Sequence, residues 1–340
     1  MLRCIELAKL GAGSVAPNPM VGAVLVYNDR IIGEGYHMQY GQAHAEVNCI
    51  NAVSEKDKAF IPESTIYVSL EPCAHHGKTP PCADLIIEKK IQTVVIGCRD
   101  PFIEVDGKGI DKLLAAGVNV IQPVLEDNCK IANKRFLTFH TKHRPYIILK
   151  WAQTANGIIG HRDHSRLLIS NEFTNRLVHK WRSEEAAILV GTNTAQFDNP
   201  SLTTRLWKGK NPIRLVIDMD LRLPASLKLF DGSVRTIVFN SLKHETHNNL
   251  LYYQCTKGPG LVPQICAALY QLNIQSVLVE GGTQLLQSFI DENIYDEARI
   301  ITNTALQVKD GTPAPVAENM ILQHTEQLQL DTVRFYKPVL

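Results

Sequence analysis

The sequence lacks an excess of charge of either sign. Its 340 residues include 35 lysine and arginine residues against 34 aspartate and glutamate residues, a formal net charge of +1. Proteins that bind nucleic acid usually present a basic field, and this chain has neither a global excess nor a long run of Lys or Arg. We therefore expect a small molecule, and no nucleic acid, as its partner.

Long hydrophobic runs are missing as well. No stretch reaches the roughly 18 apolar residues that a membrane-spanning helix needs. The N-terminal segment 1–9 carries charges among its apolar residues, unlike a signal peptide. The 8 cysteines are too scattered for a small disulfide scaffold. These absences predict a cytoplasmic protein that does not bind membranes and keeps most of its thiols reduced.

What the sequence does contain favours two globular domains. Hydrophobic residues make up 45% and charged residues 20%, the balance of an ordinary folded protein, and the length allows two separate cores. Helix and strand patterns alternate in both halves, which predicts an α/β fold. The polar segment 140–145 ends in proline and is typical of a linker. We therefore predict one domain over 1–144 and a second over 145–340.

The hydrophobic periodicity places the individual elements. In the first half, the expected helices are 2–10, 43–53, 80–88, 109–116 and 126–136, and the expected strands are 21–26, 31–32, 66–70, 94–97 and 118–121. In the second half, the clearest strands are 146–150, 187–190, 215–217, 236–239 and 276–279.

One histidine and two cysteines of the first half could share a metal ion. His44 opens an expected helix, and Cys73 and Cys82 lie between a strand and a helix. Catalytic zinc sites commonly have three protein ligands and leave a fourth position for water, and one His with two Cys is among the known sets. The beginning of a helix would also favour a thiolate at Cys82. The alternative for each residue alone is a capping or core histidine and cysteines that act as small hydrophobic residues.

Glu46 is the candidate general base beside this set. Residues two apart diverge on a regular helix, so His44 and Glu46 could share a site only at the helix's N-terminal end. Zinc lowers the pKa of a water molecule to about 7, and an adjacent carboxylate can pass the proton to a leaving amine. The combination matches a deaminase pattern with a longer spacing between the cysteines.

That longer spacing points to a particular family. Nucleoside and tRNA deaminases usually carry Cys-x-x-Cys, whereas segment 71–82, Glu-Pro-Cys-Ala-His-His-Gly-Lys-Thr-Pro-Pro-Cys, resembles the deaminase half of bacterial riboflavin-biosynthesis deaminase-reductases. Segments 17–22, 33–37 and 41–46 resemble the same family. The resemblance implies a cytidine-deaminase-like three-layer domain in which the histidine and both cysteines hold Zn²⁺.

The resemblance also implies the substrate, a diaminopyrimidinone that carries a phosphorylated ribosylamino group. His76 and Lys78 lie between the two cysteines, where they could meet the substrate phosphate or simply belong to a solvated loop. Asn18 stands between two prolines and could bind the pyrimidine or form an Asx turn.

In the second half, segment 276–283 runs from a strand through two glycines into a helix. Such a turn lets a phosphate approach backbone amides at a helix N-terminus, although it is also a common packing device. Segment 11–16 matches a relaxed G-x-G-x-x-A, but it follows a helix, so we reject it as a dinucleotide fingerprint.

The second half resembles the reductase half of the same family, which has a dihydrofolate-reductase-like fold. The resemblance is carried by segment 150–157, Arg182, and segments 191–194, 198–200 and 202–205. It implies NADPH as the cofactor. The implied NADPH contacts are Ala152, Leu168, Thr194, Asp198 and Gly282. The implied substrate contacts are Lys150, Arg182, Leu202, Arg205 and Glu280.

Several of these positions have a second interpretation or depart from the family. The two arginines suit a sugar phosphate, but each could equally lie on a solvated face, and Lys150 could steady the sugar or cap a strand. Leu168 stands where the family has an aromatic residue, which would remove a cofactor contact. Asn156 stands where the family has Asp, which would remove a charge.

We predict hydrolytic deamination of the pyrimidinone followed by NADPH-dependent reduction of the ribose to a ribityl chain. One alternative is a nucleoside or nucleic-acid deaminase with an accessory nucleotide-binding domain, which the neutral charge and the long cysteine spacing disfavour. Another is a non-catalytic regulator with a structural zinc, which would normally have four protein ligands. The sequence is compatible with a homo-oligomer and leaves the oligomeric state open.

Overall fold

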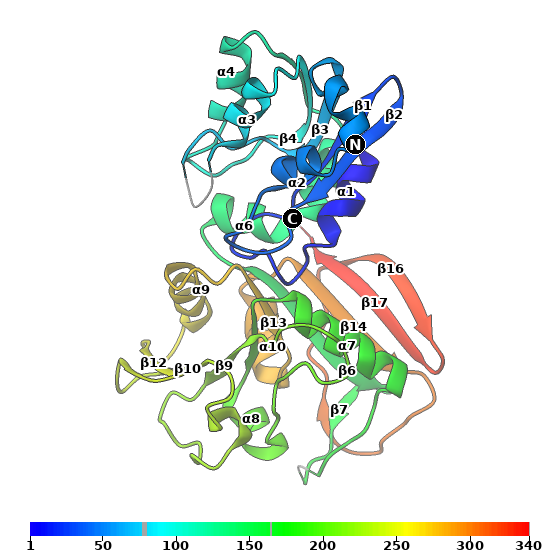
Figure 1. Ribbon diagram of the computed structural model, residues 1–340. Coiled ribbons are helices and arrows are strands. Elements are labelled where there is room, and N and C mark those ends of the chain that lie inside the picture. Colours follow the sequence, from blue (N-terminus) through cyan, green and yellow to red (C-terminus); the bar gives the residue numbers. More distant parts are fainter. Residues whose placement is uncertain (77–79, 164, 340) are drawn as a thin grey trace. The chain divides into compact units, whose positions relative to one another are not determined.

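The computed structural model describes residues 1–76, 80–163 and 165–339 (Figure 1). The chain divides into two compact units, residues 1–143 and 144–340, and each is described by itself. The expected linker at 140–145 was wrong in its first part, because helix α6 (Lys134–Lys142) continues into it. The helix continues because Phe136 and Phe139 are buried. Among the residues described, no helix combines the length and the apolar character that crossing a membrane requires.

The first unit contains a five-stranded sheet in the order β2-β1-β3-β4-β5. The hairpin between β1 and β2 turns at Asn28 and Asp29, which both have positive φ, as a tight two-residue hairpin turn requires. Strand β1 is antiparallel to β2 and β3, and the remaining pairs are parallel. The strands are β1 (Gly22–Tyr27), β2 (Arg30–Tyr36), β3 (Thr65–Leu70), β4 (Thr93–Cys98) and β5 (Asn119–Ile121).

Helices cover both faces of this sheet, which gives the predicted three layers (Figure 1). Successive residues of β1 point to opposite faces: Val24 packs with Cys4 of α1, whereas Leu25 packs with Cys49 of α2. The helices of this unit are α1 (Leu2–Lys9), α2 (Ala45–Asn51), α3 (Cys82–Glu88), α4 (Lys108–Ala115), α5 (Glu126–Ala132) and α6, with a 3-10 helix at Glu55–Glu63.

Two helix predictions in this unit needed correction. The expected helix 126–136 is two helices, α5 and α6, which meet at Asn133. The buried Asn133 side chain accepts a hydrogen bond from the Met20 amide (2.8 Å) and donates one to the Met20 carbonyl (2.9 Å). The expected helix 80–88 begins only at Cys82, because Pro81 is extended at its N-cap.

The second unit is built on a ten-stranded sheet in the order β11-β12-β10-β9-β8-β13-β6-β14-β17-β16. In this sheet order, all the strands from β12 through β10, β9, β8, β13 and β6 to β14 are parallel to one another. Strand β11 pairs antiparallel with β12, β17 pairs antiparallel with β14, and β16 pairs antiparallel with β17. The ten strands are β6 (Tyr146–Thr154), β8 (Ala187–Val190), β9 (Ile213–Ile217), β10 (Thr236–Asn240), β11 (Glu245–His247), β12 (Leu250–Gln254), β13 (Ser276–Val279), β14 (Glu297–Asn303), β16 (Met320–Leu328) and β17 (Asp331–Pro338). A small separate pair joins β7 (Ile158–Gly160) to β15 (Thr312–Pro313).

Helices again cover both faces. Val178 of α7 packs with Ile148 and Leu278 on one face, and Leu286 of α10 packs with Val279 on the other. The helices are α7 (Glu172–Glu184), α8 (Thr192–Asp198), α9 (Leu261–Gln271) and α10 (Thr283–Asp291), with a 3-10 turn at Lys228–Phe230. Both units are therefore layered α/β structures, as predicted.

Candidate functional sites

The predicted metal ligands come together in the first unit. His44 is the extended N-cap residue of α2, Cys82 is the first residue of α3, and Cys73 follows β3. The Nδ1 atom of His44 lies 3.6 Å from the Cys73 sulfur and 3.3 Å from the Cys82 sulfur. All three ligand atoms lie within 4.8 Å of one another.

This arrangement fits zinc. Bond lengths of about 2.0–2.1 Å to nitrogen and 2.3 Å to sulfur, at a tetrahedral angle, separate the nitrogen and sulfur ligands by about 3.5 Å. Hydrogen bonds from Cys82 and His44 lower the pKa of the Cys73 thiol, and the backbone amide of Cys82 also donates to this sulfur (3.3 Å). The start of α3 therefore favours a thiolate at Cys73, through the Cys82 amide, whereas the sequence predicted that it would favour a thiolate at Cys82.

Glu46 lies in the first turn of α2, two residues after the histidine. Its side chain is 3% exposed, and burial raises the pKa of the carboxyl group. The same carboxyl interacts with the Cys82 side chain. A buried carboxyl group with a raised pKa, next to a metal-ligand set, is suited to taking up and releasing a proton near neutral pH.

Two acidic residues near this site were not predicted. Glu71, 4% exposed, accepts hydrogen bonds from four backbone amides, those of Asp100, Gly107, Gly109 and Ile110, at 3.0–3.3 Å. It thereby ties the segment before Cys73 to the beginning of α4. Asp100 is also buried, and burial raises the pKa of its carboxyl group to about 7. The only signal for Glu71 in the sequence is its position directly before Pro72-Cys73.

The predicted pyrimidine contact, Asn18, lies close to the metal ligands. Its amide nitrogen is 3.1 Å from Nε2 of His37, and the His37 ring centre is 5.3 Å from that of His44. His37 is 2% exposed and its Nδ1 is 3.0 Å from the Ala43 carbonyl oxygen. His76 is exposed, and Lys78 lies outside the described residues.

A second candidate site opens at the carboxyl ends of adjacent parallel strands in the second unit. Gly191 follows β8, and Glu280 and Gly281 follow β13. The two turns are joined by hydrogen bonds from the Gly191 amide to the Gly281 carbonyl (2.8 Å) and from the Glu280 amide to the Leu189 carbonyl (3.0 Å). Ligands of open α/β sheets bind at this end of the strands.

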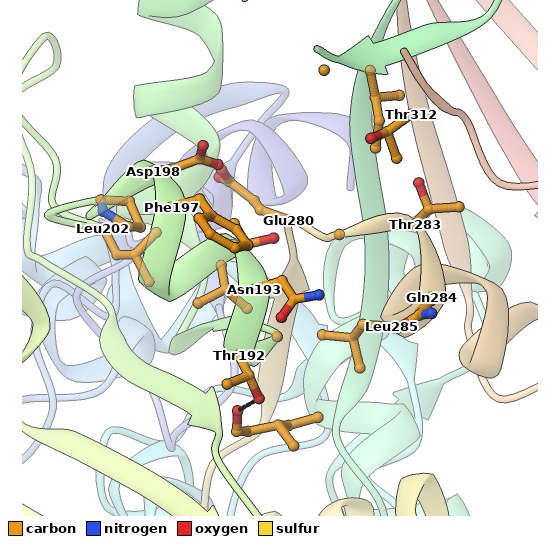
Figure 2. Close-up of a pocket in the computed structure, with 18 of the residues that line it drawn as sticks. Thr192, Asn193, Phe197, Asp198, Leu202, Glu280, Thr283, Gln284, Leu285 and Thr312 are labelled. Carbon is orange, nitrogen blue, oxygen red and sulfur yellow. Dashed lines mark hydrogen bonds between the residues drawn. The ribbon is translucent and has the colours of Figure 1, made fainter. Parts of the chain in front are cut away.

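A cavity of about 1020 Å³ lies at this end. Figure 2 shows side chains of α8, of the turn after β13 and of the start of α10 around it, including Asn193, Asp198, Glu280 and Gln284. Its size is at the upper end for a pocket that holds a cofactor or another small molecule. A Cβ added at Gly282 would lie 3.2 Å from the Thr194 hydroxyl oxygen. A side chain at this position would therefore fill the space between α8 and the beginning of α10. The glycine turn thus leaves room for a phosphate to approach the backbone, and the cavity fits NADPH.

A buried ionic cluster borders the cavity. Arg182 binds Glu280 with two hydrogen bonds of 2.8 and 2.7 Å, and the Lys150 ammonium group lies 3.9 Å from the same carboxylate. Burial works against the charge of Glu280, but Arg182 and Lys150 outweigh it and lower the pKa of this carboxyl group to about 2. Glu280 is therefore a fixed anion between two cations.

The cavity brings together most of the predicted reductase residues. Those that line it are Arg182, Thr194, Asp198, Leu202, Arg205, Glu280 and Gly282. Three others do not line it in the described part of the chain: Ala152 packs in the core under α7, Leu168 is 72% exposed, and Lys150 reaches it only through Glu280.

Asn156 has a structural use that Asp would not serve. Its amide nitrogen donates to the Val308 carbonyl (2.7 Å), and its amide oxygen accepts from Thr154 (2.8 Å). A carboxylate has no proton to donate to a carbonyl. The departure from the family at this position thus fits the local hydrogen bonds.

Comparisons with known proteins cover both units. Residues 145–331 match the RibD C-terminal domain, and residues 1–98 match the cytidine and deoxycytidylate deaminase zinc-binding region. The riboflavin biosynthesis protein RibD of Aquifex aeolicus is 36% identical, over 99% of this chain and 97% of its own length. The protein of the same name from Escherichia coli is 32% identical, over 87% and 84%.

A solved structure is similar over the same extent. It is a diaminohydroxyphosphoribosylaminopyrimidine deaminase/5-amino-6-(5-phosphoribosylamino)uracil reductase from Thermotoga maritima, with a TM-score of 0.89 and 37% identity. The match covers 99% of this chain and 97% of that one.

Proposed function

Because this chain belongs to the family of bifunctional riboflavin-biosynthesis deaminase-reductases, we propose that its two units catalyse two successive steps on one substrate. The first unit removes an amine hydrolytically from 2,5-diamino-6-ribosylamino-4(3H)-pyrimidinone 5′-phosphate. The second reduces the ribose of the product to a ribityl chain with NADPH. The chain is thus both a hydrolase and an oxidoreductase. The observation that carries the proposal is the convergence of His44, Cys73 and Cys82 beside the buried Glu46.

In the deaminase unit, His44, Cys73 and Cys82 would hold zinc. When bound, zinc supplies an activated water molecule at neutral pH. Glu46 takes the proton of that water and delivers it to the leaving amine, for which its burial and raised pKa suit it. Asn18 orients the pyrimidine ring from its position beside His37. His76 and Lys78 are our candidates for the substrate phosphate.

In the reductase unit, Thr194, Asp198 and the Gly282 turn bind the cofactor. NADPH, when bound, supplies the hydride. Arg182 and Arg205, both in the wall of the cavity, bind the sugar phosphate. Glu280 holds Arg182 in place by accepting hydrogen bonds from its Nε and Nη2 atoms. The substrate phosphate is bound by the N–H groups of Arg182 that Glu280 does not use. Lys150, Ala152, Leu168 and Leu202 complete the set of residues that we assign to this half-reaction.

Two further properties belong to the proposal. We place the protein in the cytoplasm, because its 8 cysteines are free thiols and a reducing compartment keeps two of them available for zinc. A homo-oligomer would be compatible with either unit.

Separating the two activities by mutation tests the proposal. Glu46→Ala should keep its zinc and lose deamination by on the order of 10²–10⁴-fold or more, because the proton carrier is gone. Supplied with the deaminated ribosylamino-uracil phosphate, the same variant should oxidise NADPH at the parental rate. Asp198→Ala or Arg205→Ala should show the reverse pattern.

Mass spectrometry of the products, with and without NADPH, is the measurement, and Glu88→Ala, at an exposed position of α3, is the matched control. A folded, zinc-loaded Glu46→Ala that has lost both activities would contradict independent sites. Failure of the unmodified protein to deaminate the pyrimidinone would contradict the substrate.

A further inference from the structure

Arg205 lies in the loop between α8 and β9, residues 199–212, and two hydrogen bonds attach this part of the loop to helix α7. The Arg182 guanidinium donates to the Thr203 carbonyl (3.3 Å), and the backbone amide of Arg205 donates to Nδ1 of His179 (2.9 Å). His179 and Arg182 are three residues apart, so they lie on the same face of α7. One helix face thus fixes the position of the loop and presents Arg182.

His179 reaches the site only through this backbone contact. Its side chain is 6% exposed, and it is not among the described residues that line the cavity, whereas Arg182 and Arg205 both are. Because Nδ1 accepts a hydrogen bond from an amide, the neutral ring carries its proton on Nε2. Burial and the nearby Arg182 and Arg205 lower the pKa of the imidazole to about 4, so it stays an acceptor at neutral pH.

Further along the loop, the Lys180 ammonium group of α7 lies 5.7 Å from the Trp207 ring centre, and Gly209 lies against Ser183 of α7, but neither contact involves Arg205. The Arg205 guanidinium donates to the Thr203 hydroxyl (3.0 Å) within the loop itself. Thr204 bonds with Asn211 and Lys210, which closes the loop but does not attach it to the helix. The Arg205 side chain is exposed towards the cavity. The His179 contact is therefore the direct link between the Arg205 backbone and the framework that also presents Arg182.

We propose that His179 is a positioning residue that sets the spacing between the Arg182 and Arg205 guanidinium groups, and thereby the affinity of the reductase unit for the phosphate of its substrate. The inference rests on the proposed function, in which these two arginines bind that phosphate. A phosphate bound by two guanidinium groups requires both in register, because each pairs through planar, directional donors. Loss of the acceptor at Nδ1 frees the Arg205 backbone and weakens one of the two contacts.

A pair of substitutions separates this role from packing. In His179→Asn, the amide oxygen takes the place of Nδ1 and still accepts from the Arg205 amide. In His179→Gln, the longer side chain carries its oxygen near the place of Nε2, where that amide cannot reach it. Both variants lose the ring, so a packing role would affect them equally. His247→Gln, on the exposed strand β11, is the matched control.

The measurements are KM and kcat of NADPH oxidation with the deaminated ribosylamino-uracil phosphate and with its dephosphorylated form, and the inhibition constant of ribose 5-phosphate. We expect His179→Gln to raise KM for the phosphorylated substrate and the inhibition constant by about 10-fold or more. KM for the dephosphorylated substrate and for NADPH should change by no more than about 2-fold. His179→Asn should restore most of the loss.

The outcomes distinguish the inference from the proposed function. If the unmodified protein prefers the phosphorylated substrate and Arg205→Ala removes that preference, but both His179 variants keep it or both lose it equally, the positioning role is wrong. If the unmodified protein shows no preference for the phosphate, the proposed phosphate contact is wrong and the inference falls with it.

Discussion

At the scale of single residues, the second unit concentrates its buried charge around one carboxylate. Glu280 accepts two hydrogen bonds from Arg182 and lies near Lys150, and all three side chains are largely buried. A buried ion pair contributes little net stability, because the desolvation of both charges offsets their attraction, but removing one partner is costly. We therefore attribute the cluster to the geometry of the site and not to the stability of the fold.

The free energy of unfolding of the second unit should depend on pH in part through His179. Its pKa of about 4 in the folded protein is lower than the roughly 6.5 of an exposed histidine. Between these values the unfolded chain binds more protons than the folded one, so stability falls as the pH drops through this window. Between pH 7 and pH 5, protonation of this one group in the unfolded chain should lower the free energy of unfolding by about 2 kcal/mol.

His179→Asn should therefore lose about 2 kcal/mol less than the unmodified protein over the same pH change. All three tryptophans, Trp151, Trp181 and Trp207, belong to the second unit, so urea unfolding followed by tryptophan fluorescence reports this unit alone. His247→Asn is the control. An equal loss of stability in the parent and His179→Asn would show that His179 is not held neutral by the fold.

At the scale of elements, the close approach of α2 to β2 positions the metal site. A Cβ added at Gly35 of β2 would overlap the amide nitrogen of Cys49 and lie 2.6 Å from the Ala45 carbonyl oxygen, both backbone atoms of α2. Only glycine permits this contact, and α2 carries Glu46 and begins directly after His44. The glycine of a neighbouring strand thus determines where a metal ligand lies.

Gly35→Ala should push α2 away from the sheet and weaken zinc binding about 10–100-fold, the range seen when the support of a metal ligand is lost. Overpacking should also destabilise the first unit by about 1–3 kcal/mol. Competition with a chromogenic chelator measures the affinity. Gly160→Ala is the control, because its Cβ would meet no described atom within 4 Å. Parental zinc affinity in Gly35→Ala would contradict the role of this contact.

The elements that sequence patterns predicted best are buried strands that end at glycines or polar turns. Strands β8 and β13 were predicted with their observed bounds, because each is a short run of fully buried residues. Strand β14 was missed because Glu297 and Arg299 interrupt its apolar pattern. These two form a buried ion pair of 2.6 Å, with the guanidinium 4.6 Å from the Trp181 ring centre. Strand β16 was missed because it is almost entirely exposed and lacks the alternation of a half-buried strand.

The residues of the candidate sites also divide into those that the sequence predicted and those that it did not. The metal ligands were predicted although they lie 29 and 38 residues apart, because the residue types of His-x-Glu and of the two cysteines mark them in the sequence. Glu71 and His179 were not, because each accepts from backbone amides, and a backbone amide carries no residue type that a sequence pattern can recognise. Pattern analysis identifies groups that contact a ligand, but it does not identify the groups that hold those in place.

At the scale of the whole molecule, each unit has its own hydrophobic core. The core around Ile66 and Ile96 is made only of residues from the first unit, and the core around Ile147 and Phe239 only of residues from the second. Units with separate cores can unfold separately. The predicted metal ligands all belong to the first unit.

Removal of zinc with a chelator should therefore abolish deamination and lower the stability of the first unit alone. The urea midpoint seen by tryptophan fluorescence should stay the same, as should NADPH oxidation with the deaminated substrate. Zinc release is followed with a chromogenic indicator, and re-addition of zinc is the control for reversibility. A shift of the tryptophan midpoint on chelation would show that the two units are energetically coupled.

The position of β17 inside the second sheet has a consequence for biosynthesis. This strand, Asp331–Pro338, lies between β14 and β16 and pairs with both. The second sheet therefore cannot be completed until residue 338 has left the ribosome. Every strand of the first sheet, by contrast, precedes residue 122. At about 5–20 residues per second, translation of the second unit takes roughly 10–40 s. During that interval the nascent first unit can fold and acquire its metal while the reductase unit is still being synthesised.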